Sequence, residues 1–204
     1  MRTTFTLLLS VLVFIAKAQT EDYVITTNGD TVRCYVEISN QGTAKYKVPD
    51  GKYEKIKIDK IKEYYDQLND LRFRAVYRDS SKRPEFLRVI ENGLISLYMH
   101  NNNYYGMIGA ITVAPTSMLI TKGGDRAVTI KTTSLLNNDT RQQRKDTLAV
   151  MFADKPEIYH MYKDDGKFGG GKILNLVHLY NTGKPYTPPV KKPRNPDAKK
   201  DDLY

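Results

Sequence analysis

Hydrophobic and polar residues alternate along the first two-thirds of the chain, and this pattern is typical of half-buried β-strands. The clearest run is Thr31–Ile38, where Val32, Cys34, Val36 and Ile38 share one face. Further strands are predicted at residues 23–27, 44–48, 53–58, 60–66, 72–78, 86–91, 94–100, 118–121 and 127–131. Cys34 is therefore expected to be a small, buried core residue rather than a reactive thiol.

Short turn motifs separate the predicted strands and imply antiparallel hairpins. Asn28 and Gly29 both tolerate the positive φ of a type I′ turn, so this pair predicts a tight hairpin. The Asn-Gly pair at residues 92–93 joins two strongly apolar strands and predicts the central hairpin, and the Gly-Gly pair at residues 123–124 predicts a third. Residues 104–114 are apolar but contain glycines, so neither strand nor helix is favoured there; exposed, they would mark an interaction site, although burial is commoner.

From about residue 140 the apolar period changes to that of helices. A first helix is predicted over residues 140–154. Asp154 is expected to be the N-cap of a second helix, with Pro156 in its first turn and Glu157 at the third position of a capping box.

A third helix is predicted over residues 172–181, followed by Gly183 as its C-cap. Its apolar face consists of Ile173, Leu176, Val177 and Tyr180. Strands followed by helices favour an α+β fold, with antiparallel β-hairpins in the N-terminal two-thirds and two or three C-terminal helices.

The N-terminus has the layout of a secretory signal peptide. Met1 and Arg2 precede the apolar run Phe5–Ile15, and small residues follow at Ala16 and Ala18. The run is about half the 20 residues that a membrane-spanning helix needs, which favours a signal peptide cleaved after residue 18 over an uncleaved anchor. The expected location is the periplasm, the outer envelope or the outside of the cell.

The expected domain organisation has three parts. Residues 1–18 form the signal peptide, and residues 19–183 form one β-rich α+β domain. Residues 184–204 contain five prolines among charged residues, so they are expected to be a disordered tail. No transmembrane segment is expected after removal of the signal.

The formal net charge of +9 overstates how basic the domain is. The signal peptide contributes two positive charges and the tail a net three, which leaves +4 on the domain. Lysines spread along the predicted strands are most often the solvated face of a sheet. A face that binds polyanions is the alternative, and nucleic acid is not favoured as a partner.

No cofactor, metal or catalytic residue is expected. The segment Gly166–Lys172 partly matches a phosphate-binding loop, but Ile173 stands where Mg²⁺ needs a hydroxyl and no strand precedes it. Nucleotide binding is therefore not predicted. His100, His160 and His178 lack the short spacing of metal ligands, and no serine lies in a nucleophile elbow.

Fifteen tyrosines and no tryptophan are the compositional oddity of the chain, with tyrosine pairs at residues 64–65 and 104–105. Sugar-binding and nucleic-acid-binding faces place aromatic rings beside basic groups. Tyrosine also suits half-buried strands, and that structural explanation is favoured.

Four segments are similar to those of a group of exported proteins. Asp22–Glu37, with its turn at Gly29–Thr31, resembles the opening of exported envelope proteins of Bacteroidota for which no activity is established. The hairpin Phe86–Tyr98 and the segments Phe152–Pro156 and Leu179–Asn181 also resemble theirs. The resemblance implies an envelope location in a Gram-negative bacterium and transfers no functional residue.

Taken together, these features favour a non-catalytic exported envelope protein with a binding or structural role, whose partner is a protein or a surface glycan. Two alternatives stay open: an extracytoplasmic hydrolase without a recognisable motif, and a polyanion-binding accessory protein. A pocket with converging histidine and acidic side chains would indicate the hydrolase, whereas a basic-aromatic face would indicate polyanion binding.

Overall fold

The computed structural model describes residues 21–39, 43–79, 81–101, 106–108, 111–113, 116–133, 139–164 and 168–188. The predicted signal peptide and residues 189–204 of the predicted tail lie outside these ranges. Within them the chain is an α+β protein whose strands are mostly antiparallel and whose helices come last, as the sequence predicts.

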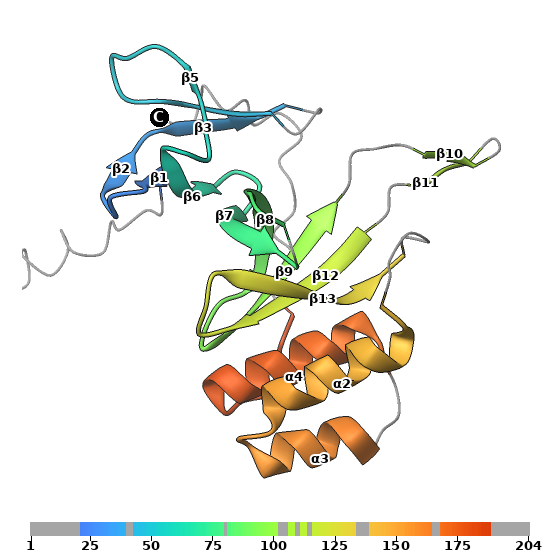
Figure 1. The fold of residues 1–204 in the computed structure, drawn as a ribbon. Coiled ribbons are helices and arrows are strands. Elements are labelled where there is room, and N and C mark those ends of the chain that lie inside the picture. The colour runs from blue at the N-terminus through green and yellow to red at the C-terminus, as the bar shows by residue number, and fades with distance from the viewer. Residues whose placement is uncertain are drawn as a thin grey trace, which may run out of the picture.

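Three structural units follow one another from top to bottom in Figure 1: a small sheet, a large sheet and a layer of helices. The strands of the large sheet are β1 (Tyr23–Thr26), β2 (Thr31–Arg33), β6 (Ile61–Asp66), β7 (Leu71–Arg78), β8 (Pro84–Glu91), β9 (Ile95–Asn101), β12 (Thr116–Lys122) and β13 (Arg126–Thr132). The small sheet contains β3 (Tyr35–Ile38), β4 (Ala44–Lys47) and β5 (Glu54–Lys55). The helices are α2 (Arg141–Phe152), α3 (Pro156–Asp164) and α4 (Gly170–Thr182).

Five strands of the large sheet close on themselves like a barrel, in the order β7-β8-β9-β12-β13. The closing contact is a short parallel pairing in which Ala127 of β13 lies opposite Arg78 of β7. Asp79, at a φ of 44°, secures it because its carboxylate accepts bonds of 2.7 and 2.8 Å from the backbone N–H and the hydroxyl of Thr129. The sequence pattern predicted hairpins and did not predict this closure.

One buried side chain from each barrel strand fills the interior. These residues are Val76, Leu87, Tyr98, Leu119 and Ala127. Each is at most 2% exposed, so the centre of the barrel is a packed core and not a channel.

The helical layer covers the outer face of β9, β12 and β13. The buried residues of α4, which pack against this face, are the four that the helical period predicts, Ile173, Leu176, Val177 and Tyr180. Gly183 ends the helix in the left-handed conformation at a φ of 72°, which confirms the predicted C-cap. None of the helices in the described ranges is long and apolar enough to span a membrane.

Three local predictions are wrong. The run Thr31–Ile38 is not one strand, because it divides at Cys34 into β2 of the large sheet and β3 of the small sheet. Asn28 does not adopt positive φ and only Gly29 does, at 95°, so the β1–β2 turn is not type I′. The backbone N–H of Thr26 donates to the Asp30 carbonyl at 2.9 Å and closes the turn. Residues 27–29 therefore form the loop, which is one residue longer than a type I′ loop. Asp154 does not cap α3, because its carboxylate binds Lys122 at 2.6 Å and the Tyr180 hydroxyl at 2.7 Å.

The small sheet is joined to the large one at Cys34, where the chain leaves β2 and enters β3. Cys34 is buried, as predicted, and packs with Val36 in the core between the two sheets. The buried carboxylate of Asp22 fixes the junction, since it accepts bonds of 2.7 Å from the backbone N–H groups of Val36 and Gln67.

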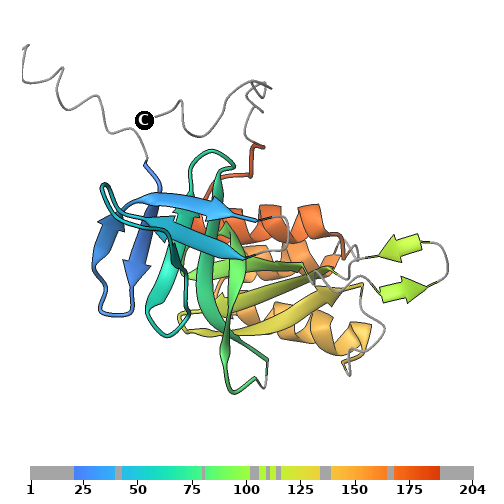
Figure 2. The ribbon, with the colours of Figure 1, turned by 90° about the horizontal axis from the view of Figure 1, so that it is seen from above.

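The apolar segment at residues 104–114 contains two short paired strands, β10 (Gly106–Ile108) and β11 (Ile111–Val113). Their backbone projects away from the barrel in Figures 1 and 2. The first residues of the predicted tail lie against α4. The centres of the Tyr186 and His178 rings are 5.5 Å apart, and the backbone N–H of Tyr186 donates to Asn175 Oδ1 at 2.8 Å.

Candidate functional site

A groove of about 570 Å³ separates the small sheet from the outer face of β6–β9. Seen from above in Figure 2, the small sheet lies across the strands of the large one. We call this space the inter-sheet groove; its main lining residues are Lys55, Ile56, Tyr64, Phe73, Phe86 and Arg88. Its size is that of a small-molecule site.

Strand register gathers the lining side chains. Phe73 lies opposite both Tyr64 and Arg88, and Arg88 lies opposite Met99, so all four residues occupy one face of the sheet. Phe86 joins them because it is two residues before Arg88 on the same strand. This is the face that the small sheet covers.

Aromatic rings form the floor of the groove. Tyr64 stacks on Phe73 with ring centres 4.9 Å apart, and the Phe86 ring meets Tyr64 edge-on at 5.0 Å. Burial, and secondarily the charge of Asp66, raises the pKa of the Tyr64 phenol. The floor is therefore uncharged at neutral pH, and Phe73 and Phe86 are only half-buried, so part of each ring is exposed in the groove.

The positive charge in the groove is not neutralised. Arg88 is half-buried, and in the part of the chain that the structure describes it has neither an ion pair nor a side-chain hydrogen bond. Arg74 and Arg78, by contrast, pair with Glu63 at 2.7 Å and with Glu85 at 3.8 Å. A guanidinium half removed from water without a counter-ion favours binding of an anion.

His100 lies at the edge of the groove and adds little charge. Its Nδ1 is 3.2 Å from the Arg78 guanidinium, which can only donate, so neutral His100 carries its proton on Nε2 facing Glu85 at 3.4 Å. Burial, and then the charge of Arg78, lowers the pKa of the imidazole despite Glu85. His100 is thus neutral at pH 7.

A second hollow, of about 680 Å³, lies at one end of the barrel. Arg74, Ser96, Tyr98 and Thr121 line it, and Arg74 is already paired with Glu63. The Ser96 hydroxyl donates to the Gly93 carbonyl at 3.2 Å, and the described residues that line the hollow include no histidine that could activate it as a base. The charged residues that line this hollow are electrically balanced, with Lys62 and Arg74 against Glu63 and Asp125.

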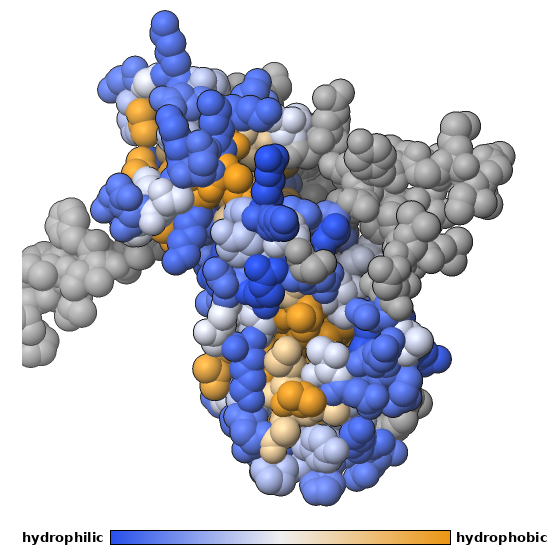
Figure 3. Space-filling model, in the orientation of Figure 1, coloured by the Kyte–Doolittle hydropathy of each residue, from blue (hydrophilic) through white to orange (hydrophobic). Residues whose placement is uncertain are grey.

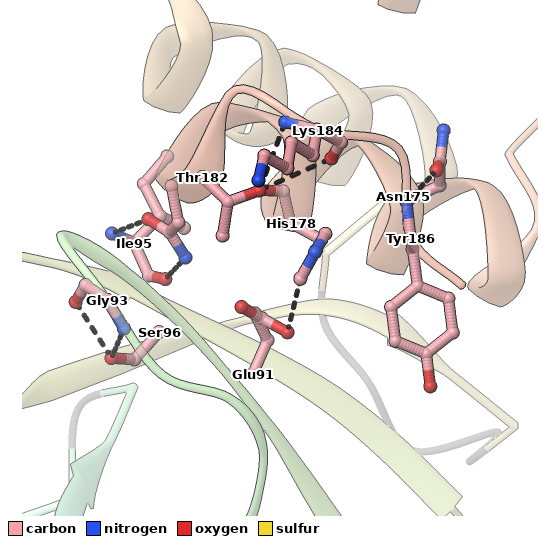
Figure 4. A network of polar contacts seen from close by, with 10 residues as sticks. Glu91, Gly93, Ile95, Ser96, Asn175, His178, Thr182, Lys184 and Tyr186 are labelled. Carbon is pink, nitrogen blue, oxygen red and sulfur yellow. Dashed lines mark hydrogen bonds and ion pairs between the residues drawn. The ribbon is translucent and has the colours of Figure 1, made fainter. Parts of the chain in front are cut away.

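The three histidines lie on β9, α3 and α4, and no group of three or more metal-ligating side chains occurs in the described ranges. His178 pairs with Glu91 at 3.2 Å, as Figure 4 shows. Of the glycine-rich segment, Gly166 and Lys167 lie outside the described residues, Gly170 begins α4, and the Lys172 amine bonds to the Met161 carbonyl at 3.1 Å.

No sequence motif marks Arg88 or Phe86 as a site residue, although Tyr64 belongs to a tyrosine pair. Their alternation with Leu87 and Val89 indicates only a strand with two faces. The groove exists because a separate sheet, formed by residues 35–55, covers one of these faces, and such a contact has no local signal.

No protein-family model, no curated protein and no solved structure matches this chain. Its function therefore has to follow from the geometry described above.

Proposed function

We propose that this protein is a non-catalytic binding protein of the cell envelope, and that it holds an acidic glycan in the inter-sheet groove. The observation that carries the proposal is Arg88, a half-buried guanidinium with no counter-ion among the described residues, set beside the partly exposed rings of Phe73 and Phe86. A sugar with a carboxylate or phosphate group matches both parts of this site.

The physical match has two components. The apolar face of a sugar ring packs on an aromatic ring, which buries carbon surface while the hydroxyls stay in contact with water. The planar guanidinium can pair with both oxygens of a carboxylate, a geometry that adds orientation to affinity. Lys55, on the opposite wall of the groove, supplies a second positive charge.

A hydrolase is less well supported by this groove. Glycoside hydrolysis normally uses two carboxyl groups placed on either side of the bond that is cut. The described residues that line the groove include no aspartate or glutamate. The chemistry present can attract and orient an acidic sugar but offers no acid–base pair, which favours binding over catalysis.

The cellular location is part of the proposal and rests on the N-terminal sequence. The apolar run Phe5–Ile15 followed by Ala16 and Ala18 supports export with cleavage after residue 18. N-terminal sequencing of protein isolated from the envelope or the medium should begin at Gln19. Recovery of protein that retains Met1 from the cytosol would contradict the location.

The binding proposal is tested by applying the mature protein to immobilised glycans that carry uronic acids, phosphates or no charge. Retention of the protein by acidic glycans and not by neutral ones is expected, and Phe86→Ala should weaken it because the stacking surface is lost. Tyr53→Ala, which removes an exposed aromatic residue outside the groove, serves as the matched control. Equal retention by neutral and acidic glycans would refute the proposal.

A further inference from the structure

The small sheet and the turn that follows it carry an unusual density of positive charge. Residues 45–60 contain six lysines and three acidic residues. We call this part of the surface the lysine lobe; its lysines are Lys45, Lys47, Lys52, Lys55, Lys57 and Lys60. Figure 3 shows the lobe as a mostly hydrophilic projection on the side of the molecule opposite the helices.

The lysines are arranged so that they repel one another. Lys45 of β4 lies directly opposite Lys55 of β5. Like charges at such a position destabilise a sheet. No lysine of the lobe forms an ion pair within the described ranges. Glu37 of β3 lies opposite Lys45 on the other side of β4 and offsets only part of this repulsion.

Two apolar side chains stand exposed among these charges, at the connection between β4 and β5. Val48 is 37% exposed and Tyr53 is 51% exposed. The Lys47 amine lies 5.8 Å from the centre of the Tyr53 ring, so charge and aromatic surface are presented together. Exposed aromatic and aliphatic side chains flanked by lysines are typical of segments that bind at a membrane–water interface.

We propose that the lysine lobe docks on an anionic membrane surface, with the lysines near the lipid phosphates and Val48 and Tyr53 in the headgroup layer. A soluble polyanion would engage the lysines equally well but would give no role to the two exposed apolar side chains. Of the named lining residues of the inter-sheet groove, only Lys55 also belongs to the lobe. Lys45 and Lys47 alternate along β4 with Ala44 and Tyr46, which face the core between the sheets, so these two lysines point away from that core.

The test is co-sedimentation of the mature protein with vesicles made of equal parts phosphatidylcholine and phosphatidylglycerol, compared with phosphatidylcholine alone. Binding to the anionic vesicles only is expected, weakening as salt is raised. Because each lysine near such a surface contributes about fivefold in affinity, K45Q combined with K47Q should weaken binding by about twenty-five-fold. K82Q with R83Q removes the same charge from the exposed β7–β8 loop and should change little.

A second variant keeps the charge and removes the apolar contacts. V48S combined with Y53S should also weaken vesicle binding while leaving retention on the soluble polyanion dextran sulfate unchanged. Two results would overturn the proposal. One is binding of the native protein to dextran sulfate but not to anionic vesicles, and the other is an equal loss of vesicle binding in the K45Q/K47Q variant and in the K82Q/R83Q control. R88Q should not affect vesicle binding, so this result is independent of the glycan site.

Discussion

The Asn181 side chain bonds to both backbone polar groups of Ile95, although 86 positions separate the two residues. Its Nδ2 donates to the Ile95 carbonyl at 2.7 Å, and its Oδ1 accepts from the Ile95 N–H at 3.0 Å. The end of α4 thus replaces a strand neighbour at the start of β9, as the dashed lines at Ile95 in Figure 4 show. The helical layer is therefore fixed to the barrel by a specific polar contact as well as by apolar packing.

Replacing Asn181 by alanine should lower the free energy of unfolding by about 2 kcal/mol, since two partly buried hydrogen bonds of about 1 kcal/mol each are lost. Urea denaturation measures the difference. Asn175→Ala is the control on the same helix, because Asn175 accepts a single bond from Tyr186 beyond the helix end. An equal loss of unfolding free energy in the two variants would mean that the contact with Ile95 contributes no more to stability than the contact with Tyr186.

Gly93 is required by this same contact. A Cβ atom at position 93 would lie 2.5 Å from Nδ2 and 2.6 Å from Oδ1 of Asn181. Gly93→Ala should therefore cost about 1–3 kcal/mol of stability, the usual range for overpacking.

The cost of Gly93→Ala should fall when Asn181 is also alanine, because the clashing group is then absent. Gly124→Ala is the control, since a Cβ there would meet no atom within 4 Å. A penalty for Gly93→Ala that persists unchanged in the double variant would point to a backbone cause instead.

Periodic patterns in the sequence predicted the elements well, and the contacts between distant elements poorly. The predicted helix over residues 172–181 is observed as Gly170–Thr182 with the same buried face, because a 3.6-residue period is a local property. The role of Asn181 is not local: nothing near it in the sequence indicates that its partner is Ile95.

The candidate site could not be predicted from the sequence for a related reason. Tyr64 was noted as part of a tyrosine pair, but the charge of Arg88 depends on which face of the sheet each side chain occupies. Glu63 and Glu85 lie on the opposite face from Arg88, where they pair with Arg74 and Arg78. Which arginine stays unpaired depends on strand register across the sheet. Sequence spacing alone does not reveal it.

Cys34 should react slowly with a thiol reagent in the native protein and rapidly in denaturant. Its side chain is buried at the junction of the two sheets, in contact with Val36. Ellman's reagent, followed over time in buffer and in guanidinium chloride, measures both rates. Fast labelling of the native protein would show that the junction between β2 and β3 opens readily.

The pH dependence of stability should carry a contribution from His100. Its pKa is lower in the folded protein than in the unfolded chain, so the unfolded chain takes up the proton first as the pH falls below about 6.5. The folded state is therefore destabilised as the pH falls below this value. This loss of stability stops growing once the pH is below the pKa that His100 has in the folded protein.

His100→Asn cannot take up that proton, so its stability should depend less on pH between 7 and 5 than that of the native sequence. Thermal unfolding of both proteins across this range gives the comparison. His160→Asn is the control, because His160 is exposed on α3. Parallel pH profiles for His100→Asn and the native protein would contradict the assigned burial.

The most direct test of the proposed function measures how Arg88 and the acidic group of the ligand depend on each other. Isothermal titration calorimetry would compare an oligomer of galacturonic acid with the same oligomer after reduction of its carboxyl groups. Arg88→Gln should weaken binding of the acidic oligomer by about tenfold or more, the equivalent of a charged hydrogen bond of 1.5–3 kcal/mol, and leave binding of the reduced oligomer unchanged. Arg83→Gln, an exposed arginine on the β7–β8 loop, should affect neither. Equal weakening of both oligomers by Arg88→Gln, or no binding of the acidic oligomer by the native protein, would contradict the account.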